Sequence, residues 1–148
     1  MNRLLPYIIL LIFASAVIGC GDITQSETQV NNRENPQGVI MTISSSIEPC
    51  ENTILNGREF QVVTNNNGDT TYWQTTDTNF ISPEGFNVGL KWNKLPNKLR
   101  AGAKKMTGWG FYINLESGWQ LGFCEGETST DSELTNESKV KWIFKRQN

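Results

Sequence analysis

The sequence predicts an all-β fold, a small antiparallel sandwich or barrel of about 7–8 strands. Three observations support this prediction. Short runs rich in β-branched and aromatic residues recur from Gly38 onward, clusters of turn residues separate them, and the runs begin roughly 8 to 15 residues apart. The runs are VIMTISSSI, EFQVV, TTYWQTT, FNVGLKW, GWGFYINL, GWQLGF and KVKWIFK.

Two hairpins are predicted within this pattern. The first spans residues 59–76 around NNNGD, and the second spans residues 109–123 around LESG, because both turns offer glycine where a positive φ is needed. Alternation is clear in KVKWIFK, where side chains point to opposite faces of the strand in turn. One face would carry Val140, Trp142 and Phe144, and the other would carry Lys139, Lys141, Ile143 and Lys145.

One stretch departs from the β pattern. Leu95, Leu99 and Ala103 recur at a four-residue spacing, and Pro96 suits the first turn of a helix. A short helix near residues 96–105 is therefore predicted. An extended loop is the alternative, because Gly102 disfavours the helix by up to about 1 kcal/mol.

The first 20 residues, MNRLLPYIILLIFASAVIGC, have the features of an export signal. Arg3 precedes an apolar span, residues 4–18, that is shorter than the roughly 20 residues needed to cross a bilayer. The span ends in the sequence VIGC, which resembles the lipobox of bacterial lipoproteins. The resemblance implies a lipid on the thiol of Cys20 and removal of residues 1–19. Two alternatives remain, a short membrane anchor with an incidental cysteine and a secreted protein whose Cys20 pairs elsewhere.

The resemblance also implies a domain organisation and a location. Residues 1–19 form the signal peptide, residues 20–37 form the lipidated cysteine and a flexible tether, and residues 38–148 form one β domain. A tether is expected because the segment after Cys20 is almost free of aliphatic residues. The protein would be lipid-anchored in the bacterial cell envelope. The outer membrane is favoured over the inner one where there are two, because Gly21 and not Asp follows the cysteine.

Lipidation of Cys20 would leave Cys50 and Cys124 as the remaining thiols. An exported chain is in an oxidising compartment, so we predict a Cys50–Cys124 disulfide. Closing a loop of about 74 residues would stabilise the fold by about 4–5 kcal/mol. A nucleophilic or redox role is disfavoured because the chain has no histidine to act as a base.

The composition excludes several classes of function. Without histidine there can be no Ser-His-Asp site and no His-ligated zinc, and no phosphate-binding glycine loop is present. We expect no metal and no cofactor. The formal net charge is only −2, so no nucleic acid partner is expected. The 15 acidic residues leave catalysis by paired carboxylates open, although none is in an apolar run that would raise its pKa.

Charge and aromatic content indicate where a partner could bind. Residues 91–105 carry six basic residues and no acid, whereas residues 116–137 carry six acids and no base. The basic segment could bind an anionic partner, or the two segments could neutralise each other. Most of the five tryptophans are expected in the core. The candidate binding residues are Trp92, Lys98, Arg100, Lys104, Trp109 and Trp119.

These observations favour a non-enzymatic binding or interaction domain on a lipid anchor, with an unidentified envelope protein or glycan as partner. Small envelope lipoproteins that inhibit lysozymes or neutralise toxins have this general build, which is an analogy of architecture only. Two alternatives stay open. One is a small glycan-active enzyme with two carboxylates roughly 5–10 Å apart. The other is a structural accessory of an envelope complex.

Overall fold

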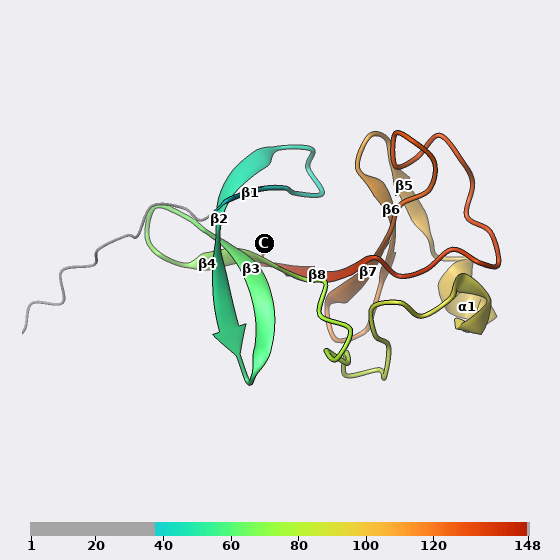
Figure 1. The fold of residues 1–148 in the computed structure, drawn as a ribbon, viewed down its shortest axis with the longest axis horizontal. Coiled ribbons are helices and arrows are strands. Elements are labelled where there is room, and N and C mark those ends of the chain that lie inside the picture. The colour runs from blue at the N-terminus through green and yellow to red at the C-terminus, as the bar shows by residue number, and fades with distance from the viewer. Residues whose placement is uncertain (1–37, 148) are drawn as a thin grey trace, which may run out of the picture. The chain divides into compact units, whose positions relative to one another are not determined.

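An eight-stranded antiparallel sheet forms the framework of the computed structural model, which describes residues 38–147 (Figure 1). The all-β prediction is confirmed, in the form of one curled half-barrel sheet. The predicted signal peptide, Cys20 and the predicted tether, residues 20–37, lie outside the described residues. The strands are β1 Gly38–Met41, β2 Ile47–Leu55, β3 Arg58–Thr64, β4 Thr70–Thr75, β5 Lys104–Met106, β6 Gly110–Asn114, β7 Trp119–Phe123 and β8 Trp142–Arg146.

The order of the strands in the sheet is β1-β2-β3-β4-β8-β7-β6-β5. Both predicted hairpins are confirmed, since β3 pairs with β4 and β6 pairs with β7. The final strand, β8, lies between β4 and β7 and pairs with both. The sheet is therefore continuous only because β8 joins the strands before residue 76 to those after residue 103.

Each face of the sheet carries a core, so β8 is buried on both sides. Ile143 and Phe144 are adjacent in β8, point to opposite faces, and are both 0% exposed. The loop-covered core lies under residues 80–103, and the hairpin-covered core lies under the β1–β2 hairpin. The loop-covered core contains Val88, Leu95, Phe111, Ile113, Leu115, Leu121, Phe123, Val140 and Ile143. The hairpin-covered core contains Ile40, Ile43, Cys50, Val63, Tyr72, Trp109, Tyr112 and Phe144.

The alternation predicted for KVKWIFK holds within β8, where Trp142 and Phe144 share one face and Ile143 and Lys145 the other, but it is wrong for Val140. Val140 packs with Ile143 in the loop-covered core, not with Phe144. Before β8 begins, the chain pairs with the loop instead, because Gly89 donates its backbone N–H to the Val140 carbonyl at 2.8 Å. Ile143 is buried because residues 80–103 cover its face of the sheet.

The helix predicted near residues 96–105 is confirmed only at its start. A 3-10 turn, η1 (Trp92–Lys94), leads into Pro96 and a single helical turn, α1 (Asn97–Arg100). The chain then forms β5, because residues 104–106 pair with β6 at the edge of the sheet. Within residues 38–147, neither helical segment is long and apolar enough to cross a membrane.

Candidate binding groove

Three side chains from neighbouring strands form a row across β4, β8 and β7. Trp73 pairs directly with Lys145, and Lys145 pairs directly with Trp119. Directly paired residues of antiparallel strands point to the same face, so all three project together. Two strand spacings, about 9.5 Å, separate the backbones of the two tryptophans. The Lys145 Nζ atom is 5.9 Å from the centroid of the Trp119 ring, within the range of a cation–π contact.

This row lies in a groove with a volume of about 510 Å³, which we call the aromatic groove. Its lining combines aromatic rings, two cations and two side-chain amides. These residues come from the β2–β3 hairpin, from β4, β7 and β8, from the segment after β4 and from the position after β8. The lining residues are Leu55, Asn56, Arg58, Phe60, Trp73, Phe80, Trp119, Lys145 and Gln147.

Three rings pack together to form part of the groove wall. The Phe60 ring is 5.2 Å from Phe80 and 5.9 Å from Trp119, and Phe80 is 4.9 Å from Trp119, between ring centroids. Phe60 is buried, whereas Phe80 and Trp119 are partly exposed. The wall is thus held by ring contacts within the domain and still offers aromatic surface to a ligand.

A turn after β4 places Phe80 in this wall. The Asp77 carboxylate accepts hydrogen bonds from the Asn79 backbone N–H at 2.8 Å and from its side-chain amide at 3.1 Å. The Asn79 backbone bond is the main cause that lowers the pKa of Asp77, with smaller contributions from the Asn79 side chain and from the charge of Arg58. The ionised carboxylate therefore stabilises the turn that carries Phe80.

The two cations of the groove, Arg58 and Lys145, differ from Lys91 and Lys105 because those two lysines form ion pairs with carboxylates. Within residues 38–147 the ion pairs are Lys91–Glu137 at 2.6 Å and Lys105–Glu133 at 3.5 Å. Neither Arg58 nor Lys145 belongs to them, and the described lining of the groove includes no carboxylate. The groove is therefore both aromatic and positively charged.

A second hollow of about 590 Å³ shares Phe60 with the aromatic groove but is lined mainly by polar side chains. Asn52 pairs with Gln61, and Gln61 pairs with Gln74, so three amides project side by side. Two carboxylates, Glu59 and Asp77, also line this hollow. Within the described part of the chain, no group of three or more potential ligand residues is placed to hold a metal ion.

Of the three tryptophans predicted as surface binding residues, Trp92, Trp109 and Trp119, only Trp119 lies in the groove. Trp109 is 5% exposed and belongs to the hairpin-covered core, so the prediction for it is wrong. The β1–β2 hairpin covers it. Trp92 packs edge-on against Phe123, with ring centroids 5.4 Å apart, and faces the loop-covered core.

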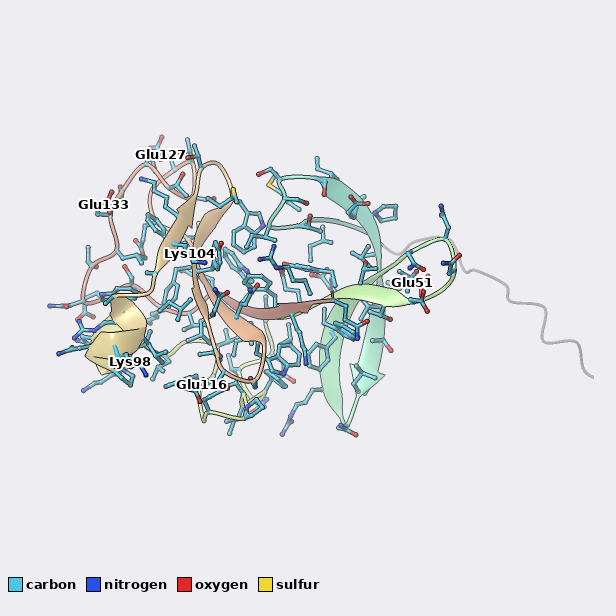
Figure 2. The ribbon with its side chains drawn as sticks, turned by 180° about the vertical axis from the view of Figure 1, so that it is seen from behind. Glu51, Lys98, Lys104, Glu116, Glu127 and Glu133 are labelled. Carbon is cyan, nitrogen blue, oxygen red and sulfur yellow. The ribbon has the colours of Figure 1, made fainter. Side chains whose placement is uncertain are left out.

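The basic candidates lie on α1 and β5, away from the residues that line the groove. Figure 2 shows Lys98 and Lys104 at the same end of the domain as Glu127 and Glu133. Ion pairs also connect the basic segment to the acidic one, through Glu133 and Glu137. Arg100 turns back to the Asn97 side chain in its own helical turn. The basic and acidic segments therefore neutralise each other in part.

The predicted Cys50–Cys124 disulfide is absent from the structure, and both cysteines are free thiols. Cys50 lies in β2, whereas Cys124 follows β7, and three strands separate β2 from β7 in the sheet. Cys50 is 2% exposed, and burial raises the pKa of its thiol.

Of the residues that line the aromatic groove, only Trp119 is predicted as a binding residue from the sequence. Trp73 and Lys145 were placed on strands, but their alignment with Trp119 depends on the position of β8 between β4 and β7. Arg58 and Phe80 reach the groove from a hairpin and from a turn. The sequence offers only a weak signal for Trp73 and Lys145. Each lies in a predicted strand, and the alternation of side chains gives its face within that strand but not its neighbours on other strands.

Comparisons with known proteins assign no family to the chain. No protein-family model matches it, and no curated protein matches it. Among solved structures, the chain is similar to the uncharacterized protein yfeY from Escherichia coli, with a TM-score of 0.42 and 17% sequence identity. The similarity covers 66% of this chain and 77% of that chain.

Proposed function

We propose that this protein is a bacterial envelope lipoprotein whose β domain binds a glycan in the aromatic groove without changing it chemically. The row of Trp73, Lys145 and Trp119 is the observation that carries the proposal. Sugar rings have an apolar CH face that stacks on indole rings, and two tryptophans two strand spacings apart can hold two rings of one chain. Asn56 and Gln147 supply amides that can both donate to and accept from sugar hydroxyls.

Binding is favoured over catalysis by the positions and pKa values of the carboxyl groups. A glycosidase needs one carboxyl group with a raised pKa to protonate the leaving group. Two carboxylates, Glu59 and Asp77, line the second hollow, which shares Phe60 with the aromatic groove, and there the pKa of Asp77 is lowered, chiefly by the backbone N–H of Asn79. A carboxyl group of that kind is ionised at neutral pH and cannot act as the acid.

The lipid on Cys20 would anchor the domain at the membrane, with residues 20–37 as a tether and the outer membrane as the favoured site. Cys20→Ser tests this part of the proposal. We expect the variant to remain uncleaved, by mass spectrometry, and to leave the membrane fraction to which the wild type belongs. Normal removal of residues 1–19 and unchanged fractionation of the variant would contradict the lipoprotein assignment.

The groove is tested by binding of short oligosaccharides to the purified chain in detergent, by calorimetry. Trp73→Ala and Trp119→Ala should each weaken the affinity about tenfold, which corresponds to about 1.4 kcal/mol. Both side chains are only half-buried, so thermal unfolding can show that each variant stays folded.

The matched control for the groove is the double variant Lys98→Glu with Lys104→Glu. Both lysines are exposed and lie outside the groove lining. The control should bind as the wild type does. If both tryptophan variants bound oligosaccharide with wild-type affinity, the groove would not be the site. If an oligosaccharide were cleaved by the wild type, binding without catalysis would be wrong.

A further inference from the structure

We propose that the glycan held in the aromatic groove is acidic and that its carboxylate or phosphate group binds to the ammonium group of Lys145. This inference rests on the proposed glycan-binding function and adds the charge class of the ligand. It starts from the place of Lys145, between two tryptophans in a row of directly paired residues.

The ring of Trp119 holds the Lys145 side chain in place. The Nζ atom is 5.9 Å from the ring centroid, and Lys145 is half-buried in the middle of the strand row. A cation–π contact fixes the position of an ammonium group but leaves its other N–H groups free to donate hydrogen bonds. Lys145 can therefore donate to an anion without first breaking an ion pair within the domain.

When a ligand covers the groove, the charge of the ligand affects its affinity. Sugar rings stacked on Trp73 and Trp119 would lie on both sides of Lys145 and remove water from its ammonium group. A buried charge without a partner is costly, whereas a charged partner repays the loss of water. A neutral glycan would leave the ammonium group unpaired, and an acidic one would neutralise it.

Arg58 adds a second positive charge near the β2–β3 turn. It lines the same groove, and its charge also acts on Asp77 in the adjoining hollow. The charge of Arg58 is therefore partly balanced within the domain, while Lys145 carries the main contact. We expect Arg58 to attract an acidic chain along the groove and to contribute less than Lys145 to its selection.

The shared chemistry is an anionic oxygen group next to a sugar ring, which either a uronic acid or a sugar phosphate supplies. Two matched pairs of ligands separate these sources. One pair is an oligogalacturonate and its methyl ester, in which the carboxylates are replaced by neutral ester groups on the same sugar chain. The other pair is a phosphorylated mannose oligosaccharide and its dephosphorylated form. Binding of all four to the purified full-length chain in detergent is measured by calorimetry.

For at least one pair, the acidic member should bind about tenfold more tightly than the neutral member, and this preference should decrease as salt screens the charges. Lys145→Gln should abolish the preference while binding of the neutral member remains. Lys145→Arg should restore it. The matched control is Lys141→Gln, an exposed lysine next to β8 that does not line the groove and should leave the preference unchanged.

The possible failures are distinguishable. Equal binding of both members of each pair would overturn the acidic preference and leave glycan binding intact. A preference that persists in Lys145→Gln would overturn the role of Lys145. If no oligosaccharide bound but a poly-glutamate peptide did, glycan binding and this inference would both be wrong, and the groove would be a peptide site.

Discussion

The indole N–H of Trp109 donates a 2.9 Å hydrogen bond to the main-chain carbonyl of Met41, which is 68 positions away in the sequence. Met41 ends β1, at one edge of the strand order, while Trp109 immediately precedes β6, next to the other edge. Figure 1 shows the loop between β1 and β2 reaching toward β6. The bond thus connects the two ends of the curled sheet over the hairpin-covered core.

Replacing Trp109 with Phe should therefore loosen the β1–β2 hairpin. The variant keeps an aromatic ring near Phe144 and Trp142 but loses the N–H donor and part of the buried area. We expect a loss of about 1–3 kcal/mol in the free energy of unfolding. Urea unfolding measures the loss. Trp92→Phe, for which edge-on packing against Phe123 is the main contact, should cost less. Equal stability of Trp109→Phe and wild type would contradict this role.

Gly122→Ala should be strongly destabilising. Gly122 pairs with Trp142, and a methyl group at this position would overlap the Trp142 indole, including its Cδ1 atom at 2.7 Å. Overpacking of this kind costs about 1–3 kcal/mol or more, because the indole must move in a filled core. Gly102→Ala is the control. A methyl group at Gly102 would lie 3.4 Å from its nearest neighbour, the backbone carbonyl oxygen of Leu99, so this variant should change stability by no more than about 0.5 kcal/mol.

The two free thiols should react at very different rates. Cys50 is buried, and burial raises its pKa, so it is both less accessible and less ionised than an ordinary thiol at pH 8. Cys124 is partly exposed. Brief alkylation of the native protein, followed by digestion and mass spectrometry, should label Cys124 well before Cys50. A peptide pair linked through these cysteines in a non-reduced digest would contradict the structure.

Glu84 should contribute stability that depends on pH. Its carboxylate accepts hydrogen bonds from the backbone N–H of Ser117 at 2.8 Å and from the Ser117 hydroxyl at 3.0 Å. Burial acts to raise the pKa of Glu84, but the bonds from Ser117 outweigh it, so the pKa is lowered from its ordinary value of 4.5. A lowered pKa stabilises the fold above the unfolded-state value, and this stabilisation is lost as the pH falls through the folded-state value.

Glu84→Gln should accordingly destabilise the protein by about 1 kcal/mol at neutral pH, since part of the bond strength is screened by water. The difference from wild type should become smaller below about pH 4. Unfolding curves at several pH values measure this trend. Glu116→Gln, in the exposed part of the same turn, serves as the control. A difference that stays constant across this range would show that the charge of Glu84 is unimportant.

The hairpins could be predicted from the sequence because their information is local. In the β3–β4 turn, the Asn65 side chain accepts hydrogen bonds from the backbone N–H groups of Asn67 and Asp69 at 2.9 and 3.0 Å. Asn and Asp favour turns through such contacts with their own neighbours. The one-turn helix after Pro96 is similarly local at its start. The helix ends where it does because β5 pairs with β6. The spacing of Leu95, Leu99 and Ala103 carries no information about that pairing.

The candidate site could not be predicted to the same extent because it depends on strand order. Trp73 and Trp119 are far apart in the sequence and become neighbours of one lysine only when β8 enters the sheet between their strands. The burial of Trp109 could not be predicted, because it depends on the β1–β2 hairpin, which is formed by residues far away in the sequence. Hydrophobic periodicity indicates which face a side chain occupies but not which segment covers that face.

The position of β8 has a consequence for folding. Tyr72 in β4 pairs with Arg146 in β8, so a central connection of the sheet closes over a large sequence separation. Contacts of this kind slow folding, because the entropy of a long loop is lost before the contact forms. Until β8 is in place, β4 and β7 each present an unpaired edge that can join another chain. A chaperone that shields these two edges would therefore be expected to raise the yield of refolded protein, and removal of β8 should convert the chain to an aggregating species.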